Sequence, residues 1–122
     1  DILKYFFAIK PPYNISTINQ EAALRRLNEA DTVKGRVQSI ITERERLALR
    51  LAGLPVVEKV WPSDSNFLLV RVKDADHIYN SLAARKIIVR NRSREIPGCI
   101  RITTGTPEEN DRLLTELESI AI

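Results

Sequence analysis

An arginine in the middle of a short apolar segment is the residue of this sequence best placed to bind a substrate. Ile100 and Ile102 flank Arg101. Because side chains alternate between the two faces of a strand, the isoleucines should lie on one face and the arginine on the other. A guanidinium held in this way can bind a carboxylate or a phosphate through two parallel hydrogen bonds. The simpler alternative is a surface arginine that pairs with a nearby acid.

A helix is predicted to start a few residues after this strand. Gly105 is expected to occupy a turn position with positive φ. Thr106 is the predicted N-cap and Pro107 the first helical residue, and Glu109 has the spacing that closes a capping box with Thr106. Arg101 should therefore lie close to the point where the strand ends and the helix begins.

Arg90 is the second candidate, at the end of a strand predicted over residues 87–90. It would lie near the same edge of the sheet as Arg101, and a phosphate also favours arginine. A solvated strand end is an equally simple interpretation of this residue.

A proline-stiffened loop contains two further candidates, Tyr13 and Asn14. A packed tyrosine beside a turn asparagine is the alternative interpretation of this pair. The roles of Arg92, Arg94 and Asn66 are left open, with the arginines expected in solvent and the asparagine expected to cap a turn.

The residues that usually ligate metals are scarce. His77 is the only histidine and Cys99 the only cysteine, so the sequence predicts no metal site. Cys99 is expected to be a small core residue. No residue of this chain is assigned a catalytic or a cofactor-binding role.

The periodicity of apolar residues, together with proline, glycine and capping residues, predicts the elements that position these side chains. Thr17 with Gln20 predicts one capping box, and Asp74 a further N-cap. The apolar run at 67–72 predicts a central strand buried on both faces. Helices are predicted at residues 2–9, 17–27, 32–52, 75–85 and 107–120, and strands at 56–61, 67–72, 87–90 and 99–103.

This order of elements predicts an α+β fold. We expect a small mixed or antiparallel sheet of about four strands, with helices packed on one face and a long helix preceding it. Residues 32–122 should form this domain, and residues 1–31 should be a segment that links it to something upstream.

Composition is that of an ordinary globular domain, with 43% apolar and 29% charged residues in a chain of 122. No apolar run approaches the roughly 20 residues of a membrane span. The net charge of +3 is small, and acidic residues are interspersed among the basic ones, so nucleic acid is not indicated. The chain has no methionine and begins within a predicted helix, which indicates a piece of a longer protein.

Four stretches, in order along the chain, resemble one family, the histidinol-phosphate aminotransferases. These are enzymes that use pyridoxal 5'-phosphate (PLP) and have the aspartate-aminotransferase fold. The stretches are Lys10–Ser16, Ser63–Leu69, Ile88–Arg90, and Ile100–Asn110 with its segments IRIT and GTPEEN.

The resemblance implies that the chain is the C-terminal small domain of such an enzyme, a cytoplasmic homodimer whose missing upstream domain binds PLP. The enzyme would move an amino group between L-histidinol phosphate and 2-oxoglutarate in histidine biosynthesis. By resemblance, Arg101 binds the α-carboxylate of the amino-acid substrate and Arg90 lies near the phosphate-bearing end. Tyr13 and Asn14 would border the active site.

The resemblance also implies that this chain has no transaminase activity alone. PLP chemistry needs a lysine for the Schiff base. None of the six lysines stands in the serine-and-lysine context of the family.

Two other readings stay open. A related PLP transaminase or decarboxylase with another substrate shares this C-terminal pattern. A small α+β domain can also bind RNA or serve regulation, but strand 99–103 lacks the aromatic residues on which RNA bases stack.

Overall fold

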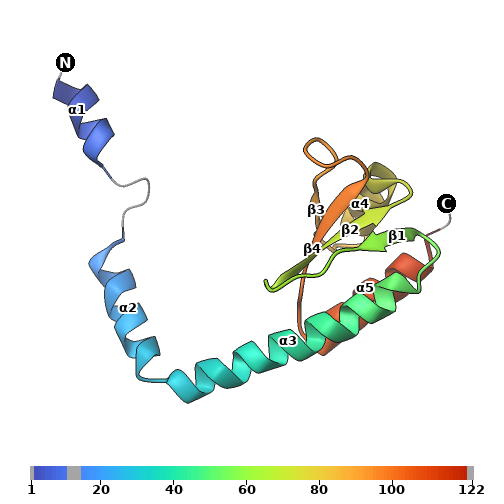
Figure 1. Cartoon of the computed structure of the whole chain (residues 1–122), viewed down its shortest axis with the longest axis horizontal. Coiled ribbons are helices and arrows are strands. Elements are labelled where there is room, and N and C mark those ends of the chain that lie inside the picture. Colours follow the sequence, from blue (N-terminus) through green and yellow to red (C-terminus); the bar gives the residue numbers. More distant parts are fainter. Residues whose placement is uncertain (1, 11–14, 121–122) are drawn as a thin grey trace. The chain divides into compact units, whose positions relative to one another are not determined.

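The computed structural model describes residues 2–10 and 15–120, which divide into two compact units, one up to Gly35 and one from Arg36 onward (Figure 1). The helices are α1 (Ile2–Ile9), α2 (Thr17–Leu27), α3 (Ala30–Ala52), α4 (Ala75–Ala84) and α5 (Pro107–Glu118). The strands are β1 (Val57–Val60), β2 (Phe67–Val72), β3 (Arg90–Asn91) and β4 (Cys99–Thr103).

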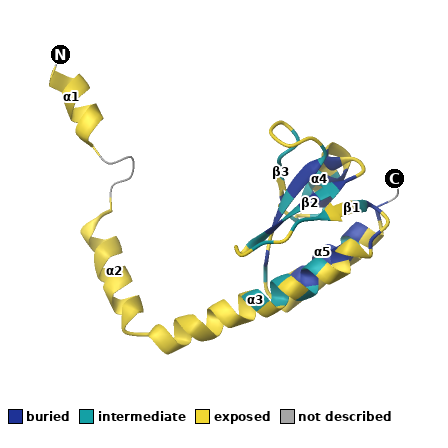
Figure 2. Cartoon of the chain, in the orientation of Figure 1, coloured by how far each residue is buried: buried dark blue, intermediate teal, exposed yellow. Residues whose placement is uncertain are grey.

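The first unit consists of helices whose side chains are almost all exposed, as the yellow ribbon in Figure 2 shows. Helices α1 and α2 begin and end where the sequence predicts. The predicted cap of α2 was wrong by one residue: Ser16, not Thr17, is the N-cap, and its Oγ accepts a hydrogen bond from the Asn19 amide at 3.3 Å. The Gln20 side chain instead donates to the Ile15 carbonyl oxygen at 3.2 Å.

The long helix α3 starts two residues before the predicted Thr32 and ends at Ala52 as predicted. Its apolar stripe divides in two along the helix. Leu47 and Leu51 are fully buried, whereas Val37 is 49% exposed. The C-terminal part of α3 therefore contributes to the core of the second unit, and the N-terminal part does not.

The second unit contains an antiparallel sheet with strand order β1-β2-β4-β3. β2 lies inside the sheet and has the predicted bounds, but it is not buried on both faces. Leu68, Val70 and Val72 are buried, while the intervening residues are only half-buried. The alternation shows that helices cover one face of the sheet. The other face, the open face, is only partly covered along β2, although Cys99 of β4, which pairs with Arg71 on this face, is fully buried.

The third strand was predicted too early in the chain. β3 comprises only Arg90 and Asn91, and residues 87–89 are not part of a strand. Ile88 is 77% exposed, while Val89 is buried and Ile87 packs against the core. The apolar run reflects this packing against the core rather than strand pairing.

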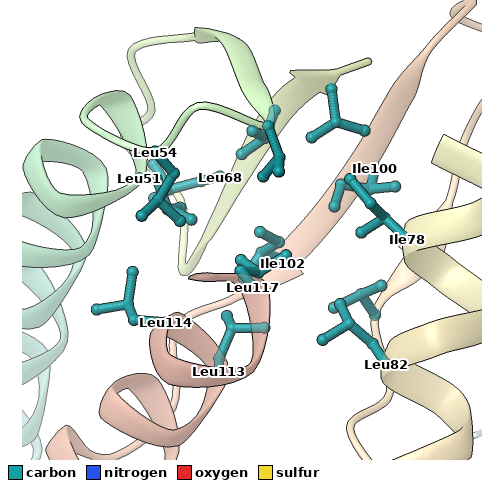
Figure 3. Packing of buried hydrophobic residues seen from close by; sticks show 14 of the residues in the cluster. Leu51, Leu54, Leu68, Ile78, Leu82, Ile100, Ile102, Leu113, Leu114 and Leu117 are labelled. Carbon is teal, nitrogen blue, oxygen red and sulfur yellow. The ribbon is translucent and has the colours of Figure 1, made fainter. Parts of the chain in front are cut away.

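One core fills the space between the covered face of the sheet and helices α3, α4 and α5 (Figure 3). Ile100 and Ile102 of β4 are 0% and 1% exposed and lie opposite the helices. The labelled residues that surround them are Leu51, Leu54, Leu68, Ile78, Leu82, Leu113, Leu114 and Leu117. The predicted α+β fold, with helices packed on one face of an antiparallel sheet, is confirmed.

The predicted caps of the last two helices are confirmed. Asp74 caps α4 by accepting a hydrogen bond from the His77 amide at 2.9 Å. Thr106 and Glu109 form the predicted capping box at the start of α5, with Pro107 as the first helical residue. Four predicted bounds, the end of α4 and of α5 and both ends of β1, move inward by one or two residues.

Gly105 is required for a reason other than the predicted one. Among the described glycines only Gly98 has a positive φ. A Cβ atom at Gly105 would lie 2.6 Å from Oε2 of Glu109, the oxygen that accepts the Thr106 amide of the capping box. The absence of a side chain therefore lets the turn lie close to the helix it precedes.

A buried polar network fixes this turn against α3. Asn110 is only 2% exposed, and its side chain bonds both the amide and the carbonyl oxygen of Gly105, at 3.0 and 3.1 Å. Its Nδ2 also donates to Glu43 at 3.0 Å. Arg46 donates to both carboxylate oxygens of Glu43 and to Asp111 at 2.6 Å. The end of β4, the start of α5 and the middle of α3 are thereby held together.

Replacing Asn110 by alanine should lower the free energy of unfolding by about 2–3 kcal/mol, because the backbone groups of Gly105 would lose their partner and the Glu43 carboxylate would lose one of its donors. Urea denaturation of the chain measures this change. Asn80→Ala is the matched control, since Asn80 is exposed on α4. Equal midpoints for the two variants would show that the network is not formed.

The network also predicts a pH dependence of stability. Hydrogen bonds from Arg46 and then Asn110, with the charge of Arg46, lower the pKa of Glu43. A carboxyl whose pKa is lower in the folded chain adds stability above its unfolded pKa and loses it as the pH falls through the folded value. The stability difference between the native chain and Glu43→Gln should therefore be largest near neutrality and shrink as the pH falls below the ordinary glutamate pKa of about 4.3.

This comparison requires urea denaturation at several pH values. Glu45→Gln is the control, because Glu45 is an exposed neighbour on the same helix. A difference that stays constant over the whole pH range would contradict the role of the Glu43 charge.

Candidate anion-binding site

The register of the sheet places Arg101 and Arg90 side by side on the open face. Arg101 pairs with Leu69 of β2 on one side and with Arg90 of β3 on the other. Directly paired residues of antiparallel strands project from the same face. The two arginines that the sequence predicts as substrate ligands are therefore brought together by strand pairing.

Arg101 is half-buried and stacked on an aromatic ring. Its guanidinium carbon lies 4.8 Å from the centroid of Phe67, and its Nε is buried without a hydrogen-bond partner in the described part of the chain. The simpler alternative, an ion pair with a nearby acid, is not formed among these residues. The stacked ring orients the guanidinium while leaving its hydrogen-bonding groups available.

Arg90 is exposed and directly opposite Arg101. Like charges at directly opposed positions of a sheet are destabilising, so an anion between them would relieve a repulsion. The short β3 is anchored next to Arg90, where the Asn91 side chain donates to Asp76 at 2.5 Å and accepts from the Ser93 amide at 2.9 Å. Arg90 therefore extends from a fixed backbone.

The arginines on the helix-covered side of the domain behave differently. Arg46 pairs with Glu43 and Asp111. Arg50 pairs with Glu118 and Arg85 with Glu116, at 3.5 and 2.8 Å. Arg46, Arg50 and Arg85 thus have carboxylate partners, and Arg112 donates to the Arg85 carbonyl oxygen at 2.7 Å, whereas the described cations on the open face of the sheet have no carboxylate partner. This distribution leaves the positive charge of the open face without a neutralising carboxylate among the described residues.

The remaining predicted site residues lie elsewhere. Tyr13 and Asn14 lie outside the described residues. In the loop after β3, Arg92 pairs with Glu95 at 3.5 Å, and Arg94 is exposed. The backbone carbonyl oxygen of Asn66 accepts a hydrogen bond from the Thr104 amide at 2.9 Å, and this bond joins the start of β2 to the end of β4.

Within the described ranges no group of three histidine, cysteine or acidic residues could hold a metal ion. Cys99 is fully buried as a free thiol, and its sulfur donates to the Pro97 carbonyl oxygen at 3.6 Å. None of the helices in the described part of the chain has the length and apolarity that crossing a membrane requires.

Two basic residues of the open face were missed from the sequence. Arg71 follows Phe67 and Leu69 at alternate positions of β2, and Lys59 of β1 is its direct partner in the neighbouring strand. The alternation in the run FLLVRV could have placed Arg71 on the same face as Arg101. It was missed because the apolar run predicted a strand buried on both faces.

The fold and these motifs match known proteins. The model of the family described as "Aminotransferase class I and II" matches residues 1–117. The chain therefore belongs to this family. A histidinol-phosphate aminotransferase from Parabacteroides distasonis is 46% identical over 124 aligned residues, and one from Flavobacterium psychrophilum is 44% identical over 121. These alignments cover 100% and 98% of this chain and 36% and 35% of the relatives.

A solved structure has the same fold and a related sequence. The histidinol-phosphate aminotransferase from Sinorhizobium meliloti, determined in complex with pyridoxal-5'-phosphate, superposes with a TM-score of 0.73 at 27% identity. The match covers 94% of this chain and 32% of that one. The chain thus spans about a third of the length of the proteins it matches. The motifs in the sequence had led us to expect such a partial match.

Proposed function

We propose that this chain supplies the substrate-anion site of a PLP-dependent histidinol-phosphate aminotransferase, which moves an amino group between L-histidinol phosphate and 2-oxoglutarate. The observation that supports it most directly is the cross-strand pair Arg90–Arg101, which has no carboxylate partner among the described residues. The identity to two enzymes of that name over nearly the whole chain supports the choice of substrates.

Two arginines side by side suit an enzyme that must accept two different anions in turn. Histidinol phosphate carries a phosphate, and glutamate carries carboxylates. A guanidinium can form parallel hydrogen bonds with either group. In this proposal the half-buried Arg101 binds the carboxylate of glutamate, and the exposed Arg90 lies at the phosphate end.

The residues of this chain do not fit the role of holding PLP. The cofactor, when bound, supplies an electron sink and is attached to a lysine amine. All six lysines of this chain are exposed, so none provides an amine shielded from water. We therefore assign PLP to the part of the enzyme outside this chain, and this chain contributes binding and orientation of the substrate anion.

The further features of the enzyme belong to the same proposal. We propose a cytoplasmic homodimer with Tyr13 and Asn14 at the border of the active site, and no nucleic-acid partner. Tyr5 and Phe7 of α1 are 72% and 75% exposed, and we expect this apolar surface to be covered in the full-length enzyme.

Arg101→Ala in the full-length enzyme should raise KM for glutamate by about 30-fold or more and leave PLP binding intact. The reason is that removing one member of a desolvated charge pair costs about 2–5 kcal/mol. Steady-state kinetics measure KM, and the absorbance of the bound cofactor measures PLP binding.

Arg50→Ala is the matched control, because Arg50 lies on the helix-covered side and pairs with Glu118. It should leave KM unchanged. An unchanged KM for both substrates in Arg101→Ala would reject Arg101 as the anion ligand.

The isolated 122-residue chain should not form a stoichiometric adduct with PLP at one lysine. Its exposed lysines should instead react weakly and without selectivity. Mixing the chain with PLP, reducing with borohydride and locating the adducts by mass spectrometry measures this, with the full-length enzyme as the positive control. One fully modified lysine in the isolated chain would contradict the assignment of PLP to the rest of the enzyme.

A further inference from the structure

A second pair of like charges faces the open side of the sheet, on the two strands farthest from Arg90. Lys59 of β1 and Arg71 of β2 are directly paired in register. Like charges in this position destabilise a sheet. Neither residue forms an ion pair with any described carboxylate. The repulsion is therefore not compensated by an acid of this domain.

Trp61 lies next to both charges. The Lys59 ammonium is 5.1 Å and the Arg71 guanidinium carbon 5.3 Å from the centroid of its ring. The Trp61 amide donates to the Leu69 carbonyl oxygen at 3.1 Å, which holds the residue beside β2. An indole attracts cations through its quadrupole but brings no negative charge. The ring thus gathers the two cations and leaves their charge unneutralised.

The burial of Arg71 makes the missing counter-charge costly. Arg71 is half-buried, and its Nε is buried without a partner in the described part of the chain. A polar group removed from water without a hydrogen bond is destabilising, and more so when it is charged. Arg46 and Arg85, the comparably buried arginines between the helices, each have a carboxylate at 2.9 Å or less.

We propose that Lys59, Trp61 and Arg71 form a second oxyanion site that binds a carboxylate or a phosphate. It is separate from the Arg90–Arg101 site, since Arg101 stacks on Phe67 whereas Arg71 lies over Trp61. The Arg71 guanidinium donates hydrogen bonds to the oxyanion, and the Lys59 ammonium adds charge from the exposed side. The site belongs to the β1–β2 pair and does not depend on the proposed aminotransferase function.

The site carries its own reporter, because Trp61 is the only tryptophan of the chain. Tryptophan emission of the 122-residue chain is titrated with inorganic phosphate and with glutarate, each at constant ionic strength set with sodium chloride. We expect a saturable change in emission with at least one of the two anions, and the tighter of them identifies the chemistry of the ligand. The absence of a change with both anions overturns the proposal.

Variants separate this site from its neighbours. Arg71→Gln should weaken binding about tenfold or more, as expected for a lost charge-assisted hydrogen bond. Lys59→Gln should weaken it less, and because Lys59 is exposed this variant remains informative if Arg71→Gln does not fold. Arg101→Gln, which alters the neighbouring anion site, and Arg50→Gln should both leave the anion-dependent change in Trp61 emission as it is in the native chain. Native affinity in folded Lys59→Gln and Arg71→Gln, or loss in Arg101→Gln, overturns a separate site.

Discussion

The alternation of side chains along β4 is the constraint on which the rest of this domain depends. Ile100 and Ile102 are buried against α3, α4 and α5, and this burial fixes the register of β4. A slip by one residue would turn the isoleucines to solvent and Arg101 into the core. The hydrophobic effect on one face of the strand therefore determines the position of a charge on the other.

The position of this strand is secured at its end by polar contacts. Asn110 bonds the Gly105 backbone and Glu43, and Arg46 joins Glu43 to α5. These groups are satisfied by one another, so their burial is compatible with a stable core. The turn between β4 and α5 is consequently part of the rigid core, and the strand that carries Arg101 ends in a fixed place.

Charge is distributed unevenly between the two sides of the sheet. Arg46, Arg50 and Arg85 on the helix-covered side are paired with carboxylates, whereas Arg71, Arg90 and Arg101 on the open face are not. The open-face arginines have aromatic or like-charged neighbours instead. A surface of this kind is expected to gain more from binding an anion than a surface whose charges are already neutralised.

The sequence by itself determined the features that depend on local chemistry. These features follow from the spacing of residues that are close together in the chain. They are the capping box at Thr106, the cap at Asp74, the bounds of β2 and β4, and the alternation around Arg101. Four stretches in order along the chain, two of which contain Arg90 and Arg101, together indicated the family. Predictions from local spacing were wrong where the same short pattern can arise from either of two physical causes. The run before Arg90 is apolar because it packs on the core and not because it pairs as a strand, and Gly105 is needed for a close contact with Glu109 rather than for its φ.

Only the tertiary structure decided which residues meet. The pairing of Arg90 with Arg101 and of Lys59 with Arg71 depends on the register between separate strands. The buried role of Asn110 depends on Glu43, which lies 67 positions away. Such contacts depend on how the sheet and the helices pack around one core. No single segment of the sequence specifies which residues of another segment it will contact. The chemistry of the open face was therefore present in the sequence as separate residues, and the fold assembled it.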